Sequence, residues 1–324
     1  MINQKGGVGK TTTAVNAAAG LARWGSRVLL VDLDPQAHAS LYLGVQAEAD
    51  EPGAYHLLLD GVPAERTLRA ITEKLSLIAA HVDLVAVEAE LARRPQRELT
   101  LRRALEPIAS RFDFIIIDCP PSLGLLTVNA LAAVREVMIP LQTHFLALQG
   151  LGMLLQTASA VRAMVNSDLR ITGVILCMYE KGTRLAQEVD NDVRQFIADA
   201  APTDVWHGAR VFDTTIRRNI KLAECPSFGK TIFDYAADSH GAEDYAGLAR
   251  EMLEMRPAAP IPATHAPPGV RPIEKSGVIA QQSKPVSEVL PAGAPLKSPE
   301  YETSQRVAAK NPIGTPSEPP ESAV

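Results

Sequence analysis

The start of the chain carries a glycine-rich loop that ends in lysine and threonine, since positions 5–12 read KGGVGKTT. Glycines in such a loop let backbone N–H groups turn inward, and Lys10 is placed to reach the β and γ phosphates of a nucleotide. Thr11 can ligate Mg²⁺, and a helix that begins at about this residue directs its positive dipole end at the same place. The usual P-loop pattern asks for a further glycine where this chain has Gln4, so the match is partial. The spacing predicts a nucleotide phosphate site.

Three aspartates follow runs of apolar residues. Asp32 and Asp34 lie in LVDLDPQ, and Asp118 ends the apolar part of FIIIDCPPS. Carboxylates that follow strands lie at the carboxyl edge of a parallel sheet, where open α/β proteins bind ligands. One such aspartate could be an ordinary turn residue, whereas three beside a phosphate loop favour a site for nucleotide and Mg²⁺. Cys119 follows Asp118 with no histidine or acid relay visible in the sequence, and we interpret it as a small buried apolar residue.

Apolar runs alternate with helical patterns in a way that predicts the fold. Strands are expected at 27–31, 114–117, 137–140 and 171–176, and helices at 12–24, 98–111, 150–165, 185–200 and 241–255. Continuous apolar runs suit strands that are covered on both faces. The order therefore predicts an α/β fold with a mainly parallel twisted sheet and helices on both faces.

Composition divides the chain into two parts. Of 24 prolines among 324 residues, 14 lie between Pro257 and Pro320, and the only aromatic residue in that stretch is Tyr301. Such a segment buries too little apolar surface to offset the entropy lost on ordering. We expect a folded domain over 1–256 and a Pro-rich disordered tail over 257–324.

Charge and cysteine content narrow the class of protein. The tail holds six basic and six acidic residues, so the body carries the whole net charge of −5. Binding of nucleic acid would therefore need a local basic patch. Three widely spaced cysteines favour a reducing compartment. No apolar run approaches the ~20 residues of a membrane-spanning helix, and no secretory signal precedes the loop, so we expect a cytoplasmic protein without membrane attachment.

Lys5, at the start of the loop, completes the pattern KGGxGKT. This pattern resembles that of the deviant Walker A ATPases, the ParA/MinD family of P-loop NTPases, and DLDPQ looks like the switch motif of ParA proteins. The resemblance covers most of residues 3–253. It implies an ATPase that uses ATP and Mg²⁺. It further implies that nucleotide contacts come from Lys5, Gly6, Gly7, Val8, Gly9, Lys10, Thr11 and Thr12.

The resemblance also assigns roles within this site. Lys5 would cross a homodimer interface to the phosphates bound by the partner subunit, and Lys10 would hold the phosphates of its own subunit. Asp34 would orient the attacking water. The Mg²⁺ shell would be completed by Thr11, Asp32 and Asp118. Catalysis would thus depend on Lys5, Lys10 and Asp34.

A second block lies near the end of the body, where 216–229 read IRRNIKLAECPSFG. It is similar to the IPRNVRLSEAPSHG block of Soj-type chromosomal ParA ATPases. Residues 210–230 carry five basic and two acidic side chains, a local charge of +3 that suits phosphate binding. Another family DNA contact falls at MYEKGTRL, 178–185, where positive charge is kept although the usual arginine position is a glycine. The resemblance therefore implies contacts with nonspecific DNA from Lys181, Arg184, Arg217, Arg218 and Lys221.

The function that follows is an ATP-dependent DNA-segregation ATPase, associated with the nucleoid, that forms a homodimer on ATP binding and works with a ParB-type centromere-binding protein. Nitrogenase-type relatives need cluster cysteines, and MinD needs a C-terminal membrane helix that Pro316, Pro319 and Pro320 disfavour. Two alternatives stay open. One is a ParA-like ATPase that positions a non-DNA cargo complex. The other is a regulator with weak or no hydrolysis, since only Met1 and Ile2 precede Asn3 and the first strand of the fold is expected to be missing or truncated.

Overall fold

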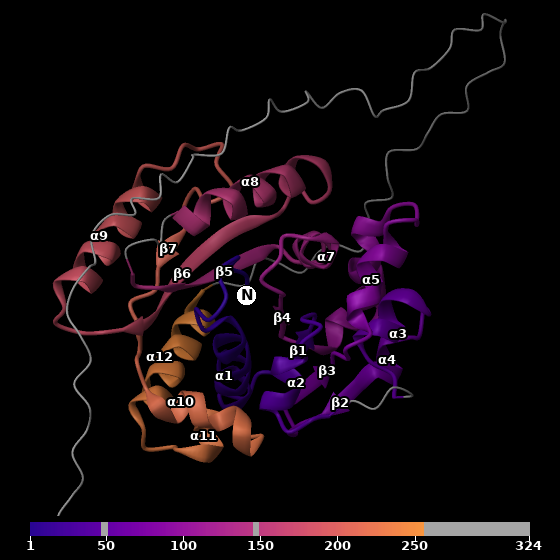
Figure 1. Cartoon of the computed structure of the whole chain (residues 1–324), viewed down its shortest axis with the longest axis horizontal. Coiled ribbons are helices and arrows are strands. Elements are labelled where there is room, and N and C mark those ends of the chain that lie inside the picture. Colours follow the sequence, from indigo (N-terminus) through magenta and orange to yellow (C-terminus); the bar gives the residue numbers. More distant parts are fainter. Residues whose placement is uncertain (47–50, 145–148, 256–324) are drawn as a thin grey trace, which may run out of the picture. The chain divides into compact units, whose positions relative to one another are not determined.

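The computed structural model describes residues 1–46, 51–144 and 149–255. Helices and strands alternate along these residues (Figure 1). The order begins with α1 (Lys10–Arg23), β1 (Val28–Asp32), α2 (His38–Tyr42), α3 (Ala54–Leu59), α4 (Ala64–Thr67), β2 (Leu68–Ala70), β3 (Leu75–Ile78), α5 (Leu84–Leu91), α6 (Thr100–Leu105) and β4 (Phe114–Asp118). It continues with α7 (Leu125–Ala133), β5 (Glu136–Gln142), α8 (Gln149–Met164), β6 (Arg170–Tyr179), α9 (Arg184–Ala198), β7 (Arg210–Val211), β8 (Ile216–Arg217), α10 (Ile220–Glu224), α11 (Ile232–Tyr235) and α12 (His240–Glu254). Short 3₁₀ turns complete it at η1 (Arg97–Leu99), η2 (Glu106–Arg111) and η3 (Cys225–Phe228).

The strands form two sheets that are mainly parallel, as the sequence predicts. In the first, the order is β2-β3-β1-β4, with β1 parallel to both β3 and β4 and with β2 antiparallel to β3. In the second, β6 is the centre and pairs in parallel with β5, β7 and β8. Parallel strands of this kind are joined by crossover helices that cover both faces. The α/β fold class is therefore confirmed.

Alternate residues of β1 pack against opposite layers of helices. Val28 and Leu30 join a core cluster that contains residues of α1 and α12. Leu29 and Val31 join a second cluster with residues of α3, α5, α6 and α7. A further cluster lies between β5, β6 and the helices α8 and α9. Because successive side chains on a strand point to opposite faces, the continuous apolar run of β1 is buried on both sides.

The first three residues lie between the two sheets. The Met1 amine donates to the Ile117 carbonyl of β4 at 2.7 Å, and the Ile2 amide donates to the Met138 carbonyl of β5 at 3.2 Å. Asn3 is buried, and its Nδ2 donates to the Pro140 carbonyl at 2.8 Å. In the described residues no strand precedes the loop, and this short segment joins the edge strands β4 and β5 through the hydrogen bonds of Met1 and Ile2.

The parallel pairing of β8 with β6 brings two distant segments together. Cys177 is in register with Ile216 and Tyr179 with Arg217, and the Arg218 amide donates to the Tyr179 carbonyl at 3.4 Å. The residues that follow β6 and those that follow β8 consequently leave the sheet at neighbouring points. The predicted tail over 257–324 lies outside the described residues. Among those described, no helix has the length and apolar character needed to cross a bilayer.

Candidate functional site

The glycine-rich loop has the backbone shape that its sequence predicts. Gly7 and Gly9 have φ values of 74° and 90°, in the left-handed region that glycine enters without strain. Gly9 caps the N-terminus of α1, and its carbonyl accepts a hydrogen bond from the Thr13 amide at 2.8 Å. The 14-residue helix therefore points its positive end at the loop. Lys5 and Gly6 are exposed on the outer side of the same loop, and Val8 is buried beneath it.

Lys10 is a buried lysine held inside this loop. Its side chain is 7% exposed, and Nζ donates to the Lys5 carbonyl at 3.1 Å. Burial lowers the pKa of Lys10, and the negative charges of Asp118 and Asp34 oppose that shift. A lysine in this position offers a positive charge to a phosphate group that enters the loop.

Asp32 and Asp118 lie side by side at the carboxyl ends of two adjacent strands. The register of β1 with β4 pairs the two residues directly, and both are fully buried. Asp32 accepts hydrogen bonds from the Ser40 amide and hydroxyl, each at 2.8 Å, and from the Asp34 amide at 3.1 Å. Burial and then the charge of Asp118 raise the pKa of Asp32 to about 7, against the lowering effect of the Ser40 and Asp34 bonds.

Among the buried acidic groups of the described residues, Asp118 has no hydrogen bond of ordinary geometry at either carboxylate oxygen. Burial raises its pKa, and the nearby Thr11 side chain is the largest influence in the opposite direction. Among the described residues, no three or more His, Cys, Asp and Glu side chains are placed so that they could hold a metal ion by themselves. A buried carboxylate with free oxygens beside a threonine hydroxyl fits a hard cation such as Mg²⁺, which takes few ligands from proteins and others from phosphate and water.

Asp34 lies on the turn that follows β1. Its side chain is 7% exposed, and Oδ1 accepts from the Gln36 amide at 3.0 Å. The Asp34 carbonyl accepts from the Ala37 amide at 2.8 Å, and Ala37 has a φ of 52°, which is strained for a residue with a Cβ atom. The turn thus holds a carboxylate at the site in a backbone conformation fixed by its surroundings.

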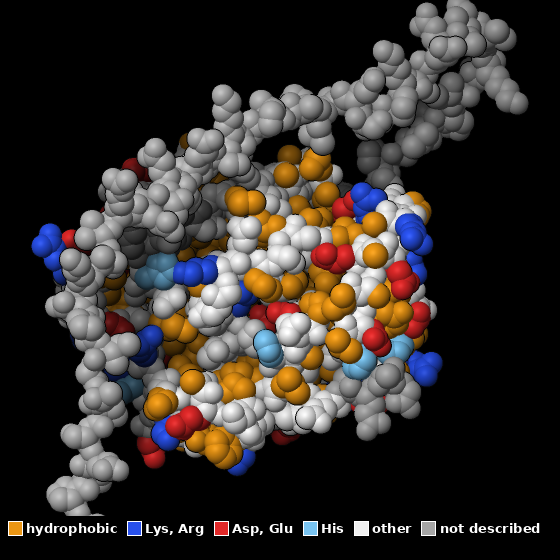
Figure 2. Space-filling view, in the orientation of Figure 1, with side chains coloured by type: hydrophobic (Ala, Val, Ile, Leu, Met, Phe, Trp, Pro, Cys, Tyr) orange, Lys and Arg blue, Asp and Glu red, His pale blue; other side chains and the backbone are white. Residues whose placement is uncertain are grey.

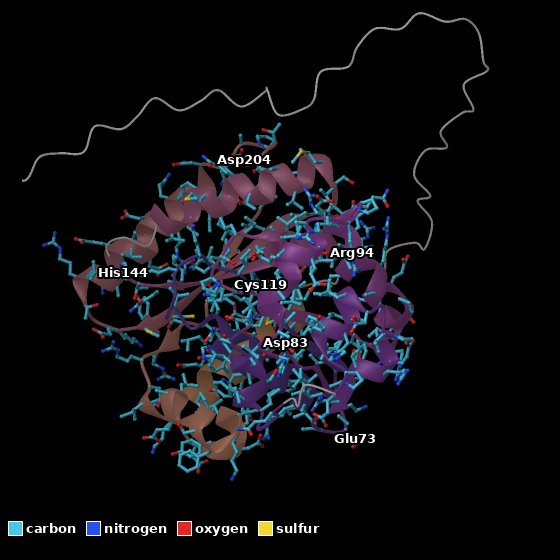
Figure 3. All side chains as sticks on the ribbon, turned by 45° about the vertical axis from the view of Figure 1, so that its right-hand side comes forward. Glu73, Asp83, Arg94, Cys119, His144 and Asp204 are labelled. Carbon is cyan, nitrogen blue, oxygen red and sulfur yellow. The ribbon has the colours of Figure 1, made fainter. Side chains whose placement is uncertain are left out.

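The structure brings together the residues that the sequence predicts for this site and adds Ser40, which sequence analysis missed. Ser40 binds both Asp32 and the Ala80 amide, so it connects the end of β1 to the residues that follow β3. No pattern in the sequence marks it, because the contact depends on where α2 packs. Cys119 is buried, which confirms its interpretation as an apolar residue, and burial raises its pKa to about 11. Figure 3 shows Cys119 in the middle of the folded body and Glu73 at its edge.

The basic residues that follow β6 and β8 are exposed, and we call them together the basic patch: Lys181, Arg184, Arg218 and Lys221. Arg184 pairs with Glu188 at 2.7 Å, Lys221 with Glu224 at 2.9 Å, and Arg218 with Glu180 at 3.6 Å. These pairs are solvent-exposed and are therefore weak. Figure 2 shows Lys and Arg side chains on the left of the drawn face with acidic side chains beside them, and charges of both signs along its right-hand rim as well.

Arg217 lies next to the basic patch but differs from its residues, because its guanidinium pairs with acidic side chains of α12. Its guanidinium bonds Asp244, which is 6% exposed, and also contacts Glu243 at 2.6 Å. The Arg217 amide donates to Asp244 at 2.9 Å as well. These bonds to Asp244 and Glu243 raise the pKa of Arg217. The residue fastens β8 to α12, and sequence analysis missed Asp244 because the pair is separated by 27 positions.

The fold and the site define the class of protein: a P-loop protein of the α/β type whose loop, lysine and strand-end aspartates are built for nucleotide phosphates. Residues 1–171 match the family model described as an AAA domain. The chain is 44% identical to the chromosome partitioning protein ParA of Myxococcus xanthus over 253 residues, which are 78% of this chain and 86% of the relative. It is 47% identical to the chromosome-partitioning ATPase Soj of Thermus thermophilus over 78% of this chain and 94% of that protein.

Among solved structures, cobyrinic acid a,c-diamide synthase from Mycobacterium smegmatis with bound ATP analogue and magnesium is similar, with a TM-score of 0.65 and 36% identity. The match covers 78% of this chain and 92% of that one. The chain belongs to the ParA/Soj family of partitioning ATPases.

Proposed function

We propose that this ATPase couples ATP binding and hydrolysis to reversible binding of nonspecific DNA, and so acts in DNA segregation. The observation that carries the proposal is the course of β6. Cys177 Sγ lies 3.6 Å from Thr13 Oγ1 in the first turn of α1, and two residues later Tyr179 pairs with Arg217 beside the basic patch. One strand thus connects the phosphate site to the surface that would meet DNA.

The nucleotide in this proposal is ATP with Mg²⁺. The Mycobacterium smegmatis relative, with its bound ATP analogue and magnesium, supports this choice. Loop amides and Lys10 would hold the phosphates, and Thr11 with Asp32 and Asp118 would hold the metal directly or through water. Mg²⁺, when bound, supplies positive charge that neutralises the phosphate oxygens during transfer.

Hydrolysis needs little covalent chemistry from the protein. Asp34, on the turn that follows β1 and held by the Gln36 amide, would orient the attacking water toward the terminal phosphate. Lys10 would stabilise the charge that develops on the phosphate oxygens. The burial of Lys10, Asp32 and Asp118 strengthens each of these interactions, because the local dielectric is low.

Lys5 would complete the site of a second subunit. Its backbone is held on both sides, since its amide donates to Asn3 Oδ1 at 2.9 Å and its carbonyl accepts from Lys10. The side chain is nevertheless exposed. A fixed backbone with a free side chain suits a lysine that reaches the phosphates of a partner, so ATP would close a homodimer.

The dimer would present the basic patch to DNA. Exposed ion pairs break at small cost, so phosphates of DNA can replace Glu180, Glu188 and Glu224 as the partners of the basic side chains. Arg217 would position Arg218 rather than carry most of the contact itself, because Asp244 holds its guanidinium. Hydrolysis would release the DNA. A ParB-type centromere-binding protein would stimulate that step, and the ATPase would reside in the cytoplasm on the nucleoid.

The test is retention on nonspecific duplex DNA with Mg–ATP, with Mg–ADP and without nucleotide, over a range of salt concentrations. The proposal predicts binding that needs ATP and weakens steeply with salt. Equal binding with ATP and ADP would contradict it. ATP hydrolysis without any DNA binding would instead favour an ATPase that positions a non-DNA cargo.

A further inference from the structure

Helix α2 connects the nucleotide site with the segment that carries Lys221. At its centre, the Ser40 amide and hydroxyl hold the Asp32 carboxylate, and the Ser40 hydroxyl also accepts from the Ala80 amide at 3.0 Å. Ser40 is fully buried. If Asp32 moves when phosphate and metal are bound, its hydrogen bonds to Ser40 would therefore move α2 with it.

Two residues further along the same helix, Tyr42 makes the opposite connection. Its ring is 2% exposed, and its hydroxyl accepts from Asn16 Nδ2 of α1 at 2.9 Å. The same hydroxyl donates to the Leu222 carbonyl of α10 at 3.4 Å. Leu222 follows Lys221, so the hydroxyl joins the helix behind the phosphate loop to the helix that carries part of the basic patch.

Asn16 extends this network on both sides. Its Nδ2 also donates to the Thr12 carbonyl at 2.8 Å, one turn earlier in α1 and next to Thr11. Its Oδ1 accepts from the Ile232 amide of α11 at 2.8 Å. Asn16 is fully buried, so these bonds are made without competition from water.

The end of α2 also meets the C-terminal block through its backbone. A Cβ atom added at Gly229 would lie 2.8 Å from the Gly44 Cα, closer than real contacts allow. Gly44 and Gly229 both have positive φ, at 72° and 60°. The two backbones touch, so a shift of α2 transmits to the turn that follows η3.

We propose that Tyr42 is a positioning residue through which the occupied nucleotide site sets the position of α10 and thereby of Lys221. The proposal rests on the function proposed above. The Tyr42 hydroxyl joins α1 and α10 by two directional hydrogen bonds, which fix the relative position of the bonded groups more closely than apolar packing does. The residues of this network are buried and closely packed. A displacement of Asp32 or Thr12 therefore displaces Leu222 as well, because the groups between them have no room to absorb it.

The first experiment measures hydrogen exchange of the amides of residues 220–225 in the full chain, without DNA. The states compared are Mg²⁺ with a nonhydrolysable ATP analogue and Mg²⁺ with ADP. The wild type is expected to differ between them about fivefold in exchange rate, as one hydrogen bond of coupling implies. Tyr42→Phe removes only the hydroxyl and should abolish the difference.

Tyr245→Phe is the matched control. Tyr245 is 1% exposed, and its hydroxyl bonds Thr13 Oγ1 of α1 at 3.1 Å. The substitution therefore also deletes a buried hydroxyl bonded to α1, but on the side of α12. It should keep the wild-type difference in exchange. The proposal is overturned if the wild type shows no difference, if Tyr42→Phe keeps it, or if Tyr245→Phe loses it equally.

The second experiment measures the ratio of DNA affinities with the ATP analogue and with ADP. Tyr42→Phe should reduce this ratio about fivefold. Its affinity for the ATP analogue in the absence of DNA should stay within about twofold of wild type. Tyr245→Phe should leave the ratio unchanged. If the wild type binds no DNA yet shows the Tyr42-dependent exchange difference, the coupling stands and the DNA part of the proposed function fails. If Tyr42→Phe keeps the wild-type ratio of DNA affinities, the proposed role of Tyr42 in the coupling is wrong.

Discussion

The phosphate site and the basic patch use charge in opposite ways. At the phosphate site, Lys10, Asp32 and Asp118 are buried and held in fixed positions by strand register and helix capping. In the basic patch, the side chains of Arg184 and Arg218 are 91% and 69% exposed. Phosphoryl transfer needs preorganised charge in a low dielectric, whereas nonspecific DNA needs only positive charge that can adapt to a backbone. We therefore expect single substitutions to act strongly at the first region and weakly at the second.

The largest effect is expected from Lys10→Ala. The change removes the buried positive charge of the loop, and ATP binding measured by calorimetry should fall by at least about 100-fold, with loss of hydrolysis. Lys5→Ala, at an exposed position of the same loop, is the comparison for ATP binding by a single subunit, because Lys5 would contact only the phosphates held by the partner subunit. It should bind ATP within a fewfold of wild type. If Lys10→Ala binds ATP with wild-type affinity, the phosphate site is not more sensitive to single substitutions than the basic patch, and the contrast between them is wrong.

Asp34→Ala is expected to separate binding from hydrolysis. Within the described residues, the hydrogen bond that its carboxylate makes is the one from the Gln36 amide, so loss of the carboxylate should leave the fold intact. Hydrolysis should fall by roughly 100-fold because the attacking water is no longer oriented. ATP-dependent retention on DNA should persist and last longer. Hydrolysis at the wild-type rate would show that another group orients the water.

Arg217→Ala should behave as a core substitution although it lies next to the basic patch. The change removes the guanidinium from the buried Asp244 carboxylate, which keeps the hydrogen bond from the backbone amide of residue 217, and this should cost about 2 kcal/mol in the free energy of unfolding by urea. Arg218→Ala, one residue further, should change that free energy by less than about 0.5 kcal/mol. Equal unfolding free energies for the two variants would show that the Asp244 pair does not hold β8 in place.

The smallest effect is expected from Arg218→Ala on DNA binding. One lost phosphate contact should weaken retention only a fewfold and reduce the slope of log affinity against log salt by about 0.9. Arg170→Ala is the matched control, because Arg170 is an exposed, ion-paired arginine at the opposite end of β6. It should leave both quantities unchanged. If both variants weaken binding equally, the DNA surface does not lie at the end of β6.

The phosphate site could largely be predicted from the sequence, because its residues lie in short segments whose pattern is visible locally. The loop, the helix behind it and the aspartates at strand ends follow from spacing, and the structure places them as predicted. The longer helices were also predicted to within about two residues. The segment 98–111 was wrong as one helix, since Pro107 lacks an amide hydrogen and η2 replaces the end of α6.

Contacts between distant parts of the chain could not be predicted. The pairs Ser40–Asp32, Tyr42–Leu222 and Arg217–Asp244 depend on how helices pack and on the register of β8, which no local pattern encodes. The short strands β2, β3, β7 and β8 were missed for the same reason, because two to four residues carry too little periodicity. One signal was available in the sequence: Asn16 is a polar residue inside the otherwise Ala-rich helix that follows the loop, and a polar side chain on such a helix needs a hydrogen-bond partner when it is buried.

The central claim is that the nucleotide site and the basic patch are energetically linked. Linkage is reciprocal, so the most direct test is the affinity for a nonhydrolysable ATP analogue measured with and without saturating nonspecific duplex DNA. If the two sites are linked, DNA raises the affinity for the analogue about tenfold or more, and the analogue raises the affinity for DNA by the same factor. The affinity for ADP does not change. An analogue affinity that is the same with and without DNA would contradict it.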